Sequence, residues 1–260
     1  MTGQRMVILA TLDVSGRVRV FLLTGEPRFI WAVDERTVRI DAQPVVGDPL
    51  GGNLKSRDEI GILVIEFASR RRMKVKGKAQ LKEDGIYIHT ESVYALCPKY
   101  IQTREIVANI TENGVARNIQ HVETLTEKQR NWIAQADTSF IASFHPETGA
   151  DASHRGGYPG FIRVLNTNKL VFPDYPGNNM FNTLGNISVN PNAGLLFIDF
   201  ERGGTLQVTG QAEVIWDENR VTGFAGAERL VGFEIEQVIE ITGANGLHWE
   251  FIEYSPFNLD

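Results

Sequence analysis

An internal repeat limits the possible folds of this chain more than any other feature of its sequence. The segment GILVIEFASRRRMKVKGKAQL (residues 61–81) aligns without a gap with GLLFIDFERGGTLQVTGQAEV (residues 194–214). Such a repeat indicates a duplicated structural unit. We therefore expect two diverged copies of one domain, at residues 1–120 and 121–260. Residues 52–54 align with residues 185–187 in the same register. Residues 8–17 align with 140–149 and residues 25–40 with 157–172, in a register shifted by the one residue that the second copy has in addition.

Each copy is predicted to consist mostly of β-strands. The runs VTGQAEVIW and LVFPDY are short, rich in β-formers and bounded by Gly, Pro or Asn. Residues 231–242 contain stretches in which apolar and acidic side chains alternate, as in a strand with one face in water. Several such strands joined by Gly-rich turns favour a small antiparallel barrel in each copy.

Two helices are predicted in the second copy. The first follows Thr126, which has the spacing of a capping box with Gln129, and should lie across the mouth of the second barrel after a linker at residues 117–125. The second lies within FPDYPGNNMFNTLGN (residues 172–186), where Asn178 or Asn179 would be the N-cap.

Composition and charge exclude several classes of protein. The 260 residues are 42% hydrophobic and include one cysteine, Cys97, so an internal disulfide or a cysteine-rich zinc site is excluded. No run is long enough to cross a membrane and the first residues do not resemble a signal peptide, so we expect a cytoplasmic protein. The net charge of −6 disfavours nucleic-acid binding, and no histidine pair has the i, i+4 spacing of a helical metal site.

The charge is divided unevenly between the two halves. Lys and Arg outnumber Asp and Glu by 18 to 14 over residues 1–120, which gives +4, and are outnumbered by 8 to 18 over residues 121–260, which gives −10. Complementary charge favours docking of the two copies on each other.

The Asn-rich segment is a candidate anion site. Free backbone N–H groups and the positive end of the helix dipole favour phosphate at a helix N-terminus, and Arg163 on a preceding strand would supply a charged partner. The spacing alone also permits asparagines that only cap a helix and an arginine on the surface.

Residues 150–200, ADASHRGGYPGFIRVLNTNKLVFPDYPGNNMFNTLGNISVNPNAGLLFIDF, resemble the oxidase-related branch of the pyridoxamine 5′-phosphate oxidase superfamily of flavin-binding split barrels. The Arg-Val-Leu strand, the polar loop, the helix ending in Asn-Pro and the Gly-Leu-Leu-Phe strand follow one another in that family's order. The resemblance implies a mainly β fold of two tandem split β-barrels with a few short helices. They would pair as an intramolecular pseudo-dimer, with FMN in the cleft between them.

The resemblance also implies which residues would contact FMN. The family's oxidase has more basic residues in the phosphate-binding segment that corresponds to residues 177–179. Its reaction on the vitamin B6 phosphate is therefore not implied for this chain. The implied contacts are Arg163, Asn178, Asn179 and Asn182 with the phosphate, Val164 and Leu165 with the isoalloxazine, and Pro173 and Asp174 with the ring or ribityl chain.

The two copies differ at these positions in a complementary way. Arg163 aligns with Trp31, and the Asn-rich segment aligns with VVGDPLGGN, whose Asp48 would repel a phosphate. Conversely, the family's basic partner strand falls on Arg71 and Arg72 of the first copy, whereas the second copy has no positive charge there. We therefore predict one composite flavin site per chain.

The resemblance implies an FMN-dependent oxidoreductase that acts on a small organic substrate, with a nicotinamide nucleotide or oxygen as electron partner. His154 is the first candidate for a catalytic group, with a purely structural histidine as the alternative; His248, Lys99 and Tyr100 are weaker candidates. A flavin-binding or flavin-sensing protein without turnover stays open. So does a binder of haem or a deazaflavin, since haem would need an axial histidine such as His145 or His154. A further pairing into a homodimer is also left open.

Overall fold

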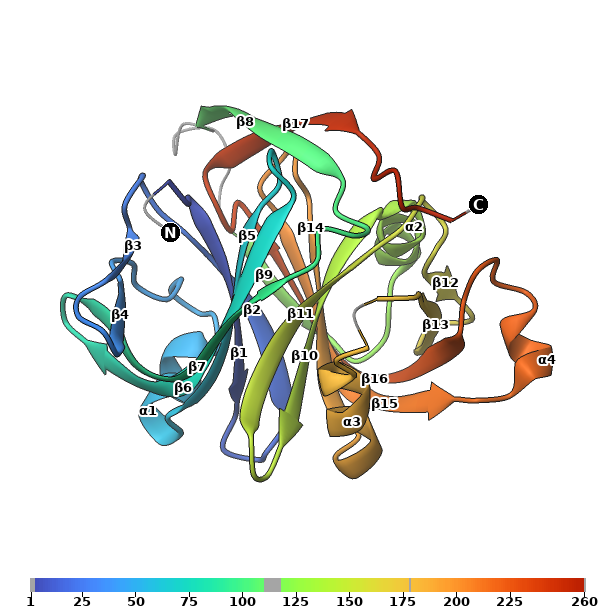
Figure 1. Cartoon of the computed structure of the whole chain (residues 1–260), viewed down its shortest axis with the longest axis horizontal. Coiled ribbons are helices and arrows are strands. Elements are labelled where there is room, and N and C mark those ends of the chain that lie inside the picture. The colour runs from blue at the N-terminus through green and yellow to red at the C-terminus, as the bar shows by residue number, and fades with distance from the viewer. Residues whose placement is uncertain (1–2, 110–117, 178, 260) are drawn as a thin grey trace.

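The chain folds into two antiparallel sheets, one from each copy (Figure 1). The computed structural model describes residues 3–109, 118–177 and 179–259. The first sheet contains β1 (Met6–Leu12), β2 (Val18–Thr24), β3 (Ile30–Ala32), β4 (Thr37–Ile40), β5 (Glu59–Glu66), β6 (Arg71–Lys82) and β7 (Gly85–Leu96). The second contains β9 (Asn118–Val122), β10 (Thr138–His145), β11 (Gly149–Gly156), β12 (Arg163–Val164), β13 (Lys169–Asp174), β14 (Asn192–Ile198), β15 (Thr205–Ile215) and β16 (Arg229–Thr242).

The strand orders show that the repeat is structural. The first sheet has the order β2-β1-β5-β6-β7-β4-β3, and the second has the order β11-β10-β14-β15-β16-β13-β12, with β9 added beside β16. Each strand of the first sheet thus has one counterpart in the second, at the same place in the order. The predicted fold of two mainly β tandem split barrels is confirmed.

Aligned glycines mark equivalent irregularities in the two copies. The pairing shifts register between Lys76 and Gly77 in β6 and between Thr209 and Gly210 in β15. A Cβ atom on either glycine would lie 2.0 Å from a carbonyl oxygen of the neighbouring strand. Only glycine fits such a bulge, which explains why these two residues match in the sequence repeat.

The two copies share a hydrophobic core. Besides one core inside each barrel, a third cluster combines Ile8, Val20 and Leu63 of the first copy with Phe140 and Leu196 of the second. The chain is therefore a pseudo-dimer whose interface is packed like a protein interior.

Four helices complete the described part of the chain: α1 (Leu50–Ser56), α2 (Glu127–Gln135), α3 (Asn182–Val189) and α4 (Glu218–Val221). The predicted capping box of α2 is present, because Thr126 Oγ1 accepts from the Gln129 N–H and the Gln129 side chain accepts from the Thr126 N–H. The predicted linker is wrong in part, since residues 118–122 form β9 and pair with β16.

The expected cap of α3 is also wrong. The helix begins at Asn182, and the N-cap position is held by Phe181 in the left-handed region, with φ 44° and no side-chain cap hydrogen bond. Asn179 precedes it with φ 59°, while Asn178 lies outside the described residues. These two left-handed positions, separated by Met180, delay the start of the helix, and residue spacing does not reveal the sign of φ.

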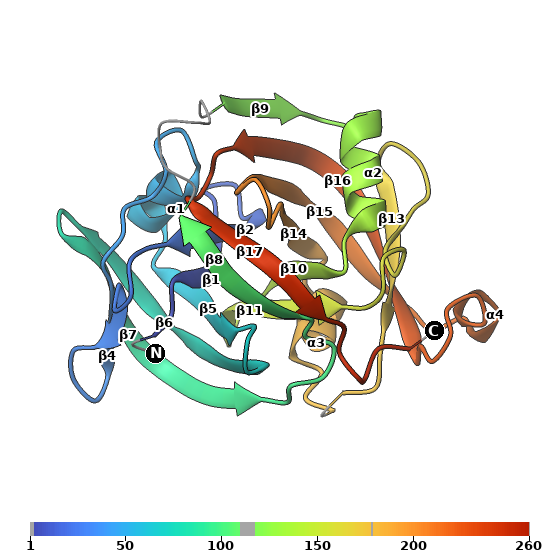
Figure 2. The same ribbon diagram turned by 90° about the horizontal axis from the view of Figure 1, so that it is seen from above.

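A two-stranded ribbon of β8 (Thr103–Asn109) and β17 (Leu247–Glu253) crosses the junction of the two copies, as Figure 2 shows from above. Leu247 and Trp249 of the ribbon pack into the shared core. The ribbon thus joins the end of the first copy to the end of the second. In the described residues no helix is both long and apolar enough to cross a membrane.

Candidate functional site

A cavity lies between the two copies beside the N-terminus of α3. Its walls come from β6 and the segment after β7 in the first copy, and from β11, β13 and the Asn-rich segment in the second. Residues of the first copy that line it are Arg72, Lys74, Leu96, Cys97 and Tyr100. Those of the second copy include Ser153, His154, Arg155, Pro173, Asp174, Asn179, Phe181, Asn182, Thr183 and Glu228.

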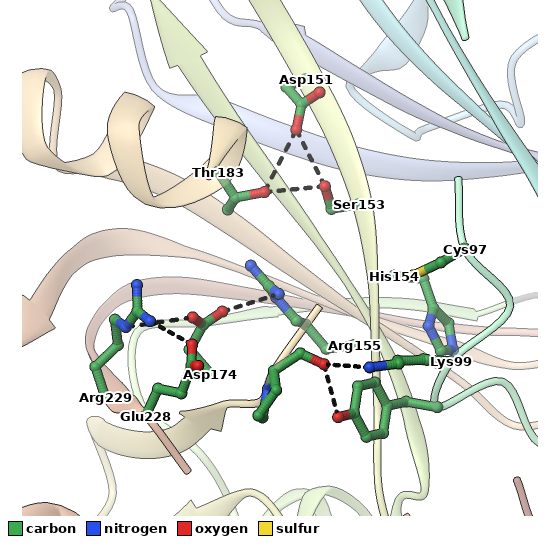
Figure 3. A network of polar contacts seen from close by, with 12 residues as sticks. Cys97, Lys99, Asp151, Ser153, His154, Arg155, Asp174, Thr183, Glu228 and Arg229 are labelled. Carbon is green, nitrogen blue, oxygen red and sulfur yellow. Dashed lines mark hydrogen bonds and ion pairs between the residues drawn. The ribbon is translucent and has the colours of Figure 1, made fainter. Parts of the chain in front are cut away.

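A buried ion pair crosses between the copies at the base of the cavity. Lys74 Nζ lies 2.8 and 2.7 Å from the two carboxylate oxygens of Asp151, and the two residues are 4% and 1% exposed. Lys74 also hydrogen-bonds Ser153 Oγ, which is 2.9 Å from Thr183 Oγ1. Figure 3 shows the triangle of Asp151, Ser153 and Thr183. Burial lowers the pKa of Lys74, and the Asp151 carboxylate opposes that shift.

A second charged group lies on the other side of the cavity, where Asp174 stands between two arginines (Figure 3). Asp174 Oδ1 is 3.3 Å from Arg155 Nη1, and Oδ2 is 3.6 Å from Arg229 Nε. Burial raises the pKa of Asp174, although both arginines act in the opposite direction. In the described structure Arg155 Nε is buried without a hydrogen-bond partner. Arg155 therefore keeps donor capacity for a bound molecule.

The helix N-termini of the two copies differ in the side-chain groups that contact them. In the first copy, Asp48 Oδ1 accepts from the N–H of Leu50, the first residue of α1, at 2.8 Å. Asp48 Oδ2 accepts from Gln207 Nε2 at 2.8 Å, and Gln207 aligns with Lys74. The N-cap residues themselves, Pro49 of α1 and Phe181 of α3, make no side-chain cap bond. The difference is that the Asp48 carboxylate accepts a backbone N–H of the first turn of α1, whereas at α3 the Asp151 carboxylate contacts the Thr183 hydroxyl.

Arg72 and His154 form another link between the copies. Arg72 Nη1 lies 3.0 Å from His154 Nδ1, and Arg72 Nε donates to the Cys97 carbonyl at 2.9 Å. A guanidinium has only donors, so Nδ1 accepts and the ring proton is on Nε2. Burial, followed by the charge of Arg72, lowers the pKa of His154 well below 6.5, so the imidazole is neutral.

The surroundings of His154 favour packing over acid–base chemistry. Along β11 it shares a face with Ala150 and Ala152, both members of the core between the copies. Its ring packs edge-on against Phe140, with centroids 5.8 Å apart. These contacts are those of a packed histidine, whereas its Nε2 is buried without a hydrogen-bond partner in the described structure and the residue lines the cavity. A catalytic role therefore stays a prediction.

The segment after β7 bridges to the Asn-rich segment. Tyr100 Oη and Lys99 Nζ both donate to the carbonyl oxygen of Pro176, at 2.9 and 3.3 Å (Figure 3). Nearby, Asn182 Nδ2 donates to Tyr94 Oη at 2.7 Å, and burial raises the pKa of Tyr94 to about 12. Groups from the first copy therefore hold the loop that leads into α3.

The structure brings only part of the predicted site together. Arg163, Val164 and Leu165 lie outside the cavity: Arg163 stacks 3.7 Å above the Phe224 ring and donates to the Gly223 carbonyl. Arg163 and Val164 form β12, and Leu165 follows it. β12 is one edge strand of its sheet, whereas β11, which lines the cavity, is at the other end of the strand order. Arg71 is exposed, because it alternates with Arg72 along β6. The predicted residues that do line the cavity are Arg72, His154, Pro173, Asp174, Asn179 and Asn182.

The sequence places Lys74 only on the basic partner strand and gives no ligand role to Arg155 or Thr183, although all three line the cavity. Two features of the sequence point to Lys74 and Arg155. Lys74 and Gln207 differ at aligned positions of the repeat, and Arg155 shares a polar strand with Ser153. The partner of Lys74 could not be found in this way, because 77 residues separate it from Asp151.

Comparison with known proteins gives one matching family model and several similar solved structures. The profile described as "Pyridoxamine 5'-phosphate oxidase" matches residues 125–248. No curated protein matches the chain. The similar solved structures each align with less than half of this chain and have low TM-scores, so they carry no argument about function.

Three of these structures illustrate the likeness. HupZ of Group A Streptococcus is 12% identical over 47% of this chain and 98% of its own, with a TM-score of 0.38. An FMN-binding protein from Syntrophomonas wolfei is 10% identical over 44% of this chain and 84% of its own, with a TM-score of 0.33. The FAD binding protein from Mycobacterium smegmatis is 15% identical over 46% of this chain and 98% of its own, with a TM-score of 0.33.

Proposed function

We propose, from the match of residues 125–248 to the family model described as pyridoxamine 5'-phosphate oxidase, that the protein binds FMN in the cavity between its two copies. The observation that carries the proposal is the helix N-terminus of α3, which faces this cavity without a side-chain cap. In the first copy the same place is filled by the Asp48 carboxylate, which acts as a built-in anion. A phosphate fits the uncapped terminus for the same physical reason.

The residues present fit the phosphate. Arg155 has a buried Nε without a partner in the described structure, and a guanidinium is the preferred donor for phosphate oxygens. Asn179 and Asn182 add neutral donors beside it. Arg163, which lies outside the cavity, is not part of this cradle.

The opposite wall supplies positive charge from the first copy. Lys74 is held by Asp151, so its charge is largely compensated. Arg72 donates to the Cys97 and Lys99 carbonyls and to His154, and no carboxylate of the described residues is within ion-pair distance of it. Arg72 therefore presents an uncompensated cation to an electron-rich ligand.

The proposed activity is that of an FMN-dependent oxidoreductase acting on a small organic substrate. Bound FMN would supply hydride or electron transfer, so the chain need only bind the cofactor, orient it and exclude water. Tyr100 and Lys99 contribute by fixing the loop at Pro176, and the Lys74–Asp151 pair contributes by fixing β11 against β6.

The visible absorption spectrum of the purified protein tests this proposal. We expect bound flavin, released as FMN on denaturation, and a loss of affinity of about tenfold or more in Arg155→Ala, since one charge-assisted hydrogen bond is removed. Arg163→Ala is the matched control and should retain FMN. A haem spectrum, or equal loss of FMN in both variants, would refute the proposed site. Steady-state oxidation of NADH or NADPH by the loaded protein then separates an oxidoreductase from a flavin-binding protein without turnover.

A further inference from the structure

A large exposed aromatic side chain lines the cavity, and a second one contacts the same arginine. Phe181, at the N-cap of α3, is 47% exposed and lines the cavity. Trp216, directly after the end of β15, is 67% exposed. Exposed aromatic rings of this size are unfavourable in water, and these two share one arginine contact instead of lying singly on the surface.

A fixed guanidinium backs both rings. The Cζ atom of Arg229 lies 4.8 Å from the centroid of Phe181 and 5.3 Å from that of Trp216. Arg229 itself is 9% exposed and is ion-paired to Asp174 and Glu228. The two rings are therefore anchored on a cation that cannot move freely, while much of their surface stays open to solvent.

The backbone at Phe181 is held in a costly conformation. Its φ of 44° is in the left-handed region, which residues other than glycine rarely adopt. Phe181 occupies the N-cap position, where Ser, Thr, Asp or Asn would normally satisfy the helix. Both features place an aromatic ring where a cap would otherwise stand, as is typical of a ligand site.

We propose that Phe181 and Trp216 form a stacking surface for the flat heteroaromatic ring of a nucleotide. The inference rests on the proposed function, because the nucleotide would be the electron partner of the flavin bound in the adjoining cavity. Stacking suits such a partner because every heteroaromatic base has a π-face and the contact needs no hydrogen-bond pattern. The ring is that of adenine or of nicotinamide, both carried by nicotinamide dinucleotides.

Calorimetric titration of the flavin-loaded protein with NAD⁺ and NADP⁺, which carry the same rings but cannot reduce the flavin, tests the stacking surface. We expect Trp216→Ala to raise Kd about tenfold or more, as loss of one base–aromatic stack does elsewhere, and Trp216→Phe to recover most of the affinity. The matched control is Trp31→Ala, since Trp31 also stacks on an arginine, Arg39, with Cζ 5.0 Å from its ring, but in the first copy. Titration with AMP and with nicotinamide mononucleotide shows which of the two rings is bound.

Unchanged affinity in Trp216→Ala, equal weakening in Trp31→Ala, or failure of all four probes to bind the native protein would overturn the stacking surface. Flavin content is measured by absorbance in the same samples. A preparation without flavin that still binds AMP or nicotinamide mononucleotide through Trp216 supports the stacking surface and refutes the flavin site. A preparation that contains flavin but whose nucleotide affinity is unchanged in Trp216→Ala supports the flavin site and refutes the stacking surface.

Discussion

Replacement of Lys74 by methionine should destabilise the fold severely, because it leaves the Asp151 carboxylate buried without its counter-charge. Asp151 is 1% exposed, and both of its oxygens are within 2.8 Å of Lys74 Nζ. Breaking a buried pair by removing one partner costs about 3–5 kcal/mol. For a chain of this size each kcal/mol corresponds to roughly 2–4 °C, so the melting temperature should fall by about 6–20 °C.

Differential scanning calorimetry and urea unfolding measure this effect, and two variants control it. Lys78→Met removes an ion pair of 3.1 Å with Asp58 whose lysine side chain is 42% exposed, and it should change stability by less than about 1 kcal/mol. The double variant Lys74→Met/Asp151→Leu removes both buried charges and should recover most of the loss. The reasoning is refuted if Lys74→Met melts like Lys78→Met, or if the double variant is no more stable than the single one.

Three further predictions concern pH and packing. The pKa of His154 is well below 6.5 in the folded protein, so the unfolded chain binds more protons in acid. The urea midpoint of the native protein should therefore fall more steeply between about pH 7 and pH 5 than that of His154→Gln. Equal slopes would contradict this. The pKa of Asp174 is raised, so acid neutralises its carboxylate and releases Arg155 from the ion pair. Titration with inorganic phosphate should therefore show tighter binding at low pH, and the change of affinity with pH should be smaller in Asp174→Asn. Gly194→Ala puts a Cβ 2.9 Å from a carbonyl oxygen of β2 and should cost about 1–3 kcal/mol in urea unfolding, whereas Gly185→Ala in α3 meets no atom within 4 Å and should not destabilise.

The fold could be predicted because its signals repeat. The bulge glycines Gly77 and Gly210 and the packing glycines Gly61 and Gly194 occur at equal spacing in both copies, since each satisfies the same steric demand. Gly61 packs on β11 and Gly194 packs on β2, so the same residues also specify the pseudo-dimer. Because the same steric demand for glycine occurs in both copies, one sequence without homologues is enough to reveal it.

The site was harder to predict, because its contacts connect distant residues and depend on side-chain direction. The Arg-Val-Leu match at residues 163–165 fell on β12, an edge strand, while the arginine that lines the cavity is Arg155 on β11. Spacing predicts that Asn178 or Asn179 caps the helix, but the left-handed backbone at Phe181 delays the start of α3 to Asn182. Neither the sign of the backbone angle φ nor the order of strands in a sheet can be read from residue spacing.

The one measurement that tests the central claim most directly is the number of FMN molecules bound per chain at saturation, by equilibrium titration with the protein concentration fixed by amino-acid analysis. One FMN per chain is predicted, because the α3 site is uncapped while Asp48 and Gln207 fill its counterpart in the first copy. Two FMN molecules per chain, or none at saturating concentration, would contradict a single composite site.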